Sequence, residues 1–297
     1  RSDPRLGAEL VLRGYLELLR PANVVTAIAD VLAGYAIAGR PAPALLPWLV
    51  AATACLYGGG VVLNDVFDRR LDAVERPERP IPSGRVSAGA AAAFGGGLLA
   101  AGVACAAAAT AAAGLVAAAT AALVLLYDGL SKRHGLLGPL TMGACRGFNL
   151  LLGIAAAPAV LGHAWPLAII PLVYISAVTL VSRGEVHGGK RGAAGLALIS
   201  LGGVIVALTV LAAAAGPGRI AALAVLLLLT WRVVPPFWRV YREPQPALIR
   251  QAVRAGVLSL VLVDATFGAA FAGPLYAAAI LATGVAAAGL ARLFSVT

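Results

Sequence analysis

Residues 88–122 read AGAAAAFGGGLLAAGVACAAAATAAAGLVAAATAA, a run without one charged side chain. Small residues such as these allow helices inside a membrane to approach closely. The rest of the chain is similar, because 61% of its 297 residues are hydrophobic and only 12% are charged. Soluble domains carry about 25% charged residues. We therefore expect an all-α, polytopic membrane protein.

About 20 consecutive apolar residues are enough to cross a bilayer as a helix. The sequence predicts ten such spans, or nine if one of the last pair is re-entrant or interfacial. Their expected ranges are 21–39, 43–63, 87–107, 109–127, 137–161, 164–182, 193–215, 219–238, 250–271 and 274–292. The connections are short, which predicts a single membrane domain over residues 1–297. Residues 1–20 alternate leucines with charged side chains, as expected of an amphipathic helix in the membrane interface.

Basic residues predict the orientation, because Lys and Arg accumulate in cytoplasmic loops. If the N-terminus is cytoplasmic, all but three of the 23 Lys and Arg side chains fall on the cytoplasmic side. The exceptions are Arg40 and Arg219 on the opposite side and Arg146 within a span. We expect a multi-pass protein of a prokaryotic plasma membrane with a cytoplasmic N-terminus. The net charge of +10 then reflects topology and the lipid bilayer, and no nucleic-acid partner is expected.

Charge is concentrated in residues 62–85, VLNDVFDRRLDAVERPERPIPSGR. The spacing of Asn64, Asp65, Asp68 and Asp72 places their side chains on one face of a helix. Such carboxylates repel one another and need a cation, and Mg²⁺ is usually held by one or two carboxylates together with substrate phosphates. Nearby guanidinium groups could donate to phosphate oxygens: Arg69, Arg70, Arg76 and Arg79. The stretch predicts a site for a diphosphate and its metal, with a solvated charged loop as the alternative.

Three motifs together resemble a known family. NDVFDRRLD (64–72) resembles the NDxxDxxxD signature of the UbiA superfamily of intramembrane prenyltransferases, and RPERPIPSGRVS (76–87) is similar to its usual continuation. LLRPANVVTA (18–27) is similar to the RPxN feature of the family's first span. YDGLSKR (127–133) resembles the family's Tyr and Lys loop after the fourth span. The motifs occur in family order along essentially the whole chain.

The resemblance implies a helical fold around a central cavity, with active-site loops at its cytoplasmic mouth, here residues 64–86 and 182–195. These loops would bind Mg²⁺ and the diphosphate of a polyprenyl donor. The resemblance also implies roles for individual residues. The metal ligands would be Asp65, Asp68 and Asp72 with Asn64 beside them, the substrate would contact Asn23, Arg79 and Lys132, and Tyr127 would lie near the reacting carbon.

Neutralising the leaving diphosphate with Mg²⁺ and basic groups would allow the allylic carbon–oxygen bond to ionise. Aromatic faces could stabilise the resulting cation. The candidates are Tyr57, Tyr127, Phe148 and Tyr174, with ordinary packing as the alternative for each.

The second loop departs from the family pattern. SRGEVHGGKRGAAG (182–195) contains one acid, Glu185, where the family usually has several aspartates. One interpretation is that Lys190, with Arg183 and Arg191, supplies fixed positive charge in place of a second metal. Glu185 would then remain a ligand or take part in proton transfer, together with His187. The other interpretation is a decayed site, which the intact first motif disfavours.

The predicted spans contain several polar residues, among them Asp30, Arg146, Asn149 and Asp264. Ionisable residues in membranes are rare and are often functional. They predict a polar substrate pocket in which a carboxylate orients or deprotonates an acceptor hydroxyl. The alternative is internal pairing of Asp30 or Asp264 with Arg146. With MGACRGFNLLLG (142–153), this set resembles the UbiA-like branch that includes EboC-type proteins.

These features predict a Mg²⁺-dependent enzyme that transfers a prenyl group from a polyprenyl diphosphate to a small polar or aromatic acceptor, with a hydroxylated acceptor favoured. One alternative is a terpene cyclase that ionises the same donor without an acceptor. Another is a non-catalytic protein that binds or transports lipid diphosphates.

Overall fold

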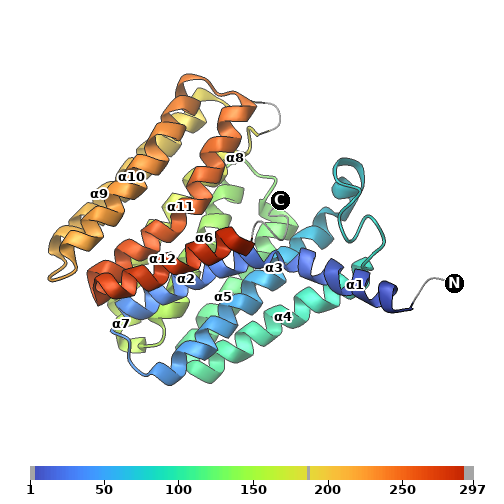
Figure 1. Cartoon of the computed structure of the whole chain (residues 1–297), viewed down its shortest axis with the longest axis horizontal. Helices are drawn as coiled ribbons and strands as arrows, with labels where there is room; N and C mark the ends of the chain where they lie inside the picture. Colours follow the sequence, from blue (N-terminus) through green and yellow to red (C-terminus); the bar gives the residue numbers. More distant parts are fainter. Residues whose placement is uncertain (1–3, 186–187, 291–297) are drawn as a thin grey trace.

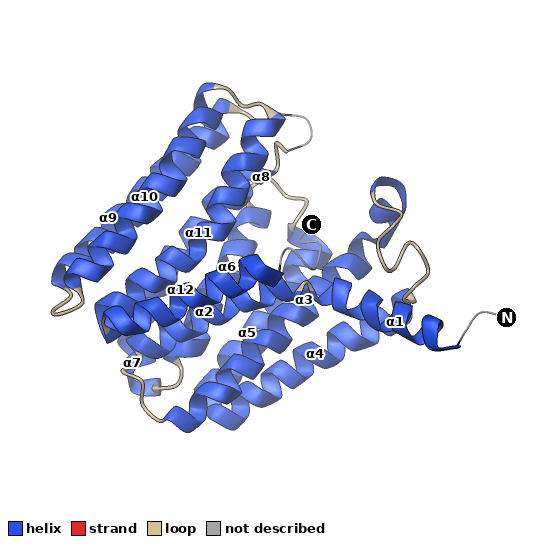
Figure 2. Cartoon of the chain, in the orientation of Figure 1, coloured by secondary structure: helices blue, strands red, loops and turns tan. Residues whose placement is uncertain are grey.

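The computed structural model of the chain describes residues 4–185 and 188–290. Within these ranges the elements are α-helices with short 3₁₀ and π-helical turns, joined by loops, and no β-strand is present (Figure 2). The predicted all-α class is therefore confirmed. The helices are α1 (Pro4–Leu19), α2 (Pro21–Ile37), α3 (Leu46–Glu75), α4 (Ala88–Ala109), α5 (Ala111–Leu126), α6 (Leu137–Ile154), α7 (Pro158–Ala164), α8 (Ile169–Ser182), α9 (Arg191–Ala214), α10 (Arg219–Arg242), α11 (Pro246–Ala272) and α12 (Pro274–Leu290).

Helix α2 connects the two sides of the bundle (Figure 1). It packs against α3 and α6 on one side and against α11 and α12 on the other. Helices α3, α4 and α5 pack together, as do α9, α10 and α11. A displacement of α2 would therefore affect both groups.

Among the described residues, seven helical stretches are long and apolar enough to cross a membrane: Pro43–Glu75, Ala88–Ala109, Ala111–Ser131, Pro158–Ser182, Arg191–Ala214, Arg219–Arg242 and Pro246–Ala272. The protein is an integral, multi-pass membrane protein, but the predicted count of nine to ten spans was too high. The spans expected at 21–39 and 137–161 correspond to the shorter helices α2 and α6, and the span expected at 274–292 corresponds to α12, which is described as far as Leu290. Helix α2 has 17 residues and is about 26 Å long at 1.5 Å per residue, less than the roughly 30 Å of the hydrocarbon core. The apolar sequences of α2 and α6 also contain polar residues: Asp30 on α2, and Arg146 and Asn149 on α6.

Helix α3 is longer than a bilayer core requires. Its 30 residues extend for about 45 Å, and its carboxylates lie in its last three turns. The segment 64–86, expected to be a loop, is thus helical as far as Glu75 and forms turns only from residue 76. The helix continues because no proline or glycine follows Asn64 until Pro77, and the residue before a proline disfavours helical geometry.

Glycines bring α2 and α6 into close contact. A Cβ atom added at Gly34 would lie 2.9 Å from the Cα atom of Gly153, and a Cβ atom added at Gly153 would lie 2.9 Å from the Cα atom of Gly34. One turn earlier on each helix, Asn149 donates a 2.8 Å hydrogen bond to Asp30. The close glycine contact and the polar contact therefore depend on the same helix separation.

We predict that Gly34→Ala destabilises the protein, because the added methyl group would force α2 and α6 apart. Overpacking of this kind costs about 1–3 kcal/mol, more than the roughly 1 kcal/mol that alanine gains over glycine in a helix. Thermal unfolding in detergent would measure the difference. Gly97→Ala on α4 is the matched control, since a Cβ atom there meets no atom within 4 Å; an equal response of the two variants would contradict the prediction.

Candidate active site

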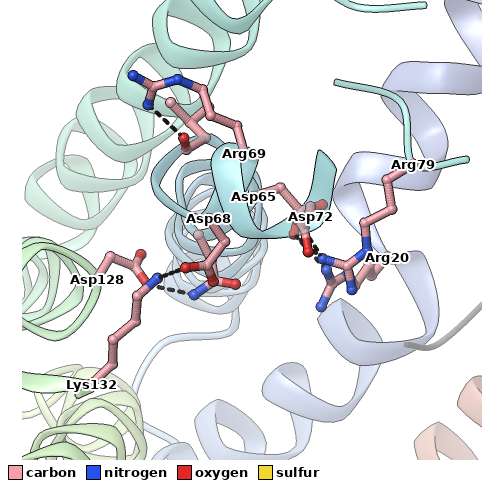
Figure 3. Close-up of polar contacts among 10 residues, drawn as sticks. Arg20, Asp65, Asp68, Arg69, Asp72, Arg79, Asp128 and Lys132 are labelled. Carbon is pink, nitrogen blue, oxygen red and sulfur yellow. Dashed lines mark hydrogen bonds and ion pairs between the residues drawn. The ribbon is translucent and has the colours of Figure 1, made fainter. Parts of the chain in front are cut away.

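The carboxylates at the end of α3 form two groups (Figure 3). In the first group, Asp65 accepts a 2.6 Å hydrogen bond from Arg20. Arg79 donates a 2.8 Å bond to Asp72 and a 3.4 Å bond to Asp65. Asp65 and Asp72 are each only 4% exposed. Two arginines from separate segments therefore neutralise these buried acids.

The second group faces the segment that follows α5. Lys132 Nζ lies 2.6 Å from Asp68 Oδ1, and Asn64 donates a 2.7 Å hydrogen bond to Asp128. The three aspartates of the motif were expected to converge on one face, but their ion pairs divide them between two neighbouring strips of the helix. The side chains of Arg20, Arg79 and Lys132 supply the positive charge that was expected beside these carboxylates.

Two residues of the site, Arg20 and Asp128, were not identified from the sequence. Arg20 lies between α1 and α2 with φ of 46°, in the left-handed region where only a constrained backbone holds a non-glycine residue. Asp128 is buried in the π-helical turn Tyr127–Ser131, and such turns are frequent at functional sites. Both residues stand inside the quoted motifs, so position within LLRPANVVTA and YDGLSKR was the available signal.

A cavity of about 140 Å³ adjoins the second group and is lined by Phe67, Asp128, Gly129, Leu130, Lys132 and Arg133. Oxygen atoms of Asn64, Asp68 and Asp128 are the hard ligands that Mg²⁺ prefers. In residues 4–185 and 188–290, no group of three or more His, Cys, Asp or Glu residues could hold a metal by itself. The residues therefore fit a Mg²⁺ ion whose coordination is completed by substrate phosphates. The predicted ligand set of Asp65, Asp68, Asp72 and Glu185 stays a prediction.

Hydrogen bonds connect the second loop, residues 182–195, to the segment after α5 and to α11. Arg183 donates bonds of 3.1–3.2 Å to the carbonyl oxygens of Lys132, Arg133 and His134. Arg250 on α11 donates a 3.0 Å bond to the Glu185 carbonyl oxygen. The loop therefore lies beside the segment that contains Lys132.

Glu185 is electrostatically connected to the first loop. Burial raises the pKa of its carboxyl group, while the nearby charges of Arg250 and Arg76 oppose that rise. Arg76 follows α3, so charges of the two predicted active-site loops act on each other. Lys190 is exposed and lines a second cavity of about 310 Å³ beneath this loop. His187 lies outside the described residues.

Other predicted residues are placed as follows. Asn23 lies in the first turn of α2, where its carbonyl oxygen accepts a 2.7 Å bond from Thr26. Tyr127 is half-buried at the start of the π-helical turn, and Phe148 is half-buried on α6. Tyr174 is fully buried and donates a 2.8 Å bond to the Gly256 carbonyl oxygen, which indicates a packing role.

The polar residues of α2 and α6 form a buried network. Asp30 accepts a 2.7 Å bond from Arg146 and a 2.8 Å bond from Asn149. Asn149 accepts a 2.7 Å bond from Thr53, and the Arg146 guanidinium lies 5.0 Å from the ring centroid of Tyr57. Internal pairing, the alternative to an acceptor pocket, is thus present for Asp30; a substrate role stays a prediction.

The sequence profile of the UbiA prenyltransferase family matches residues 27–260. The chain belongs to the UbiA prenyltransferase family. Its similar relatives include digeranylgeranylglyceryl phosphate synthases. That of Methanopyrus kandleri is 36% identical over 155 residues, covering 50% of this chain and 56% of the relative. That of Sulfolobus acidocaldarius is 31% identical over 199 residues, covering 64% and 70%. In the first case the match spans only about half of the relative.

Solved structures show the UbiA fold. A digeranylgeranylglyceryl phosphate synthase structure is 20% identical with a TM-score of 0.68, covering 89% of this chain and 99% of that chain. A UbiA homologue from Archaeoglobus fulgidus bound to GPP and Mg²⁺ is 15% identical with a TM-score of 0.55, covering 93% and 99%. The finer resemblance to the EboC-containing branch stays a prediction.

We predict that Arg79→Ala destabilises the protein in EDTA, because it leaves Asp72 without its ion-pair partner in a largely buried site. Breaking such a pair costs about 3 kcal/mol. Arg69→Ala on the preceding helix α3 is the matched control, since Arg69 is exposed and, among the described residues, its side chain bonds only to the Val66 carbonyl oxygen. Its expected effect is within about 0.5 kcal/mol. Equal thermal stability of the two variants would show that the Arg79 ion pairs contribute little.

Proposed function

We propose that this UbiA family member transfers a prenyl group from a polyprenyl diphosphate to a hydroxylated acceptor within the membrane, with Mg²⁺ as cofactor. The observation that carries the proposal is a cavity lined by Asp128 and Lys132 at the end of an otherwise apolar bundle, with Asp68 paired to that same Lys132. Carboxylates, an ammonium group and a metal-compatible oxygen set are the chemistry that a Mg²⁺-diphosphate requires.

The basic residues supply the charge complement of the donor. Arg20, Arg79 and Lys132 point toward the same helix end, and each is less than one-fifth exposed. A diphosphate bound there would take hydrogen bonds from groups that otherwise neutralise carboxylates. Bound Mg²⁺ would supply additional neutralisation of the leaving group. The allylic carbon–oxygen bond would break with its electrons going to the diphosphate, and the acceptor oxygen would bond to that carbon as it loses its proton.

The relatives favour a particular acceptor. Their name specifies a glyceryl phosphate that carries two geranylgeranyl groups, which is consistent with the hydroxylated, non-aromatic acceptor expected from the sequence. We propose a glyceryl phosphate lipid as the acceptor. The surplus of basic residues near the second loop, with Arg183, Lys190 and Arg250, complements such an anionic group. We also propose that both loops and the N-terminus are cytoplasmic, in a prokaryotic plasma membrane, because the basic residues are strongly biased to that side.

We predict acceptor-dependent release of diphosphate. Purified protein in nanodiscs would receive Mg²⁺ and labelled geranylgeranyl diphosphate, with and without a geranylgeranylglyceryl phosphate lipid. An ether-linked product formed only with acceptor supports the transferase, and EDTA should abolish it. Release without acceptor, accompanied by a hydrocarbon product, would identify a cyclase instead. Donor binding without any release, across a panel of acceptors, would indicate a non-catalytic binding protein or transporter.

We predict that Asp68→Ala lowers turnover by at least about 100-fold, the loss typical of removing one group that stabilises charge in a transition state. The matched control is Glu75→Ala, an exposed acid on the same helix. Its turnover should stay near that of the unmodified protein. Retained activity in Asp68→Ala would exclude this carboxylate from the metal and diphosphate site.

A further inference from the structure

A second acidic cluster lies deep in the bundle, away from the mouth. Asp30 on α2 and Asp264 on α11 are both fully buried, and Arg146 on α6 is 8% exposed. Asp30 is ten residues along α2 from Arg20, about 15 Å at the rise of a helix. The cluster is thus about three helical turns from the Arg20–Asp65 ion pair.

The hydrogen bonds of this cluster are incomplete. Asp30 uses only Oδ2, which accepts from both Arg146 and Asn149. Asn149 also donates to the Ala27 carbonyl oxygen, and Arg146 also donates to Thr26 at 3.3 Å. Three buried oxygens, Oδ1 of Asp30 and both oxygens of Asp264, find no donor among the described residues. Buried polar atoms in folded proteins are almost always hydrogen-bonded.

The charges are also unbalanced. Arg146 is paired with Asp30, so Asp264, which has no hydrogen-bond partner among the described residues, would carry an uncompensated charge if ionised. Such a charge in an apolar interior costs several kcal/mol. Helices α2 and α11, which contain Asp30 and Asp264, pack against each other, and each contains a buried carboxyl oxygen without a donor. Two ionised carboxylates cannot hydrogen-bond to each other, whereas a protonated carboxyl group donates to an ionised one. A single proton would therefore remove the excess charge and satisfy Oδ1 of Asp30.

We propose that Asp264 is protonated and donates a hydrogen bond to Asp30, which stays paired with Arg146. The resulting cluster is neutral and connects α2, α6 and α11. Asp264 is thus a positioning residue, because it acts through α2, whose first residue follows Arg20 at the mouth.

The neighbouring groups support a proton rather than a metal ion. Tyr174 on α8 donates its hydroxyl to the Gly256 carbonyl oxygen, and Tyr57 on α3 presents its ring to Arg146. Neither supplies a further ligand. Mg²⁺ needs near-octahedral coordination and Ca²⁺ takes six to eight oxygens, whereas three free carboxyl oxygens are present. A proton in a hydrogen bond between two carboxyl groups needs only two oxygens.

Infrared spectroscopy of the full chain in nanodiscs at neutral pH would test this proposal. We expect a carbonyl stretch of a protonated carboxyl group that shifts in heavy water and is lost in Asp264→Asn. Asp30→Asn should also lose this band, because Asp264 must then ionise to pair with Arg146. Asp72→Asn, a buried acid already neutralised by Arg79, is the matched control and should keep it.

Thermal unfolding provides a second measurement. Asp264→Asn should unfold close to the wild-type temperature, because its amide can still donate to Asp30. Asp264→Ala should unfold several degrees lower, because the donor is lost. A wild-type spectrum without the band of a protonated carboxyl group, or persistence of that band in Asp264→Asn, would overturn the proposal. A change of the band when sodium in the buffer is replaced by choline would also overturn it, because it would indicate a bound metal cation instead of a proton. These readouts need no turnover, so they stay interpretable if the proposed transferase activity is wrong.

Discussion

The ion pairs at the end of α3 are the interactions on which the arrangement of the mouth depends. Asp65, Asp68 and Asp72 stand on one helix, and like charges at this spacing destabilise it. Their partners come from three separate segments: the α1–α2 junction, the turn after α3 and the turn after α5. Neutralising the helix thus brings these segments together at one point.

The same pairing explains how the site can remain stable without its substrate. Each basic group that could contact a diphosphate is already bonded to a carboxylate that could contact a metal. Binding a metal and a diphosphate together would exchange one set of opposite charges for another, so the net charge at the mouth would change little. Binding either alone would leave one set without its partners. The geometry therefore favours joint binding of the two, consistent with the preference of Mg²⁺ for sites that include phosphate.

Much of this structure could be predicted from the sequence, because its signals are local. Apolar runs indicated the helical membrane class, and NDVFDRRLD located the charged end of α3. The partners could not be found this way: the bond between Arg20 and Asp65 joins residues 45 positions apart, and only the fold shows which of several arginines is close. The same reason explains why Asp128 was missed. The excess in predicted spans arose because an apolar run does not show where a helix ends: α2 ends at Ile37 and α6 at Ile154, before the expected residues 39 and 161.

The mouth and the interior solve the same electrostatic problem under different conditions. At the mouth, Asp65, Asp68 and Asp72 each have an arginine or lysine partner, so these carboxylates can stay ionised and could exchange that partner for a ligand. In the interior, α2 and α6 meet at glycines that leave little room for rearrangement, and Arg146 is the partner of Asp30 in the described part of the chain. A protonated Asp264 would add no charge there, whereas an ionised one would need a further cation. The ion pairs of α3 therefore suit an exchange of partners, and the proposed cluster suits a fixed position of α2.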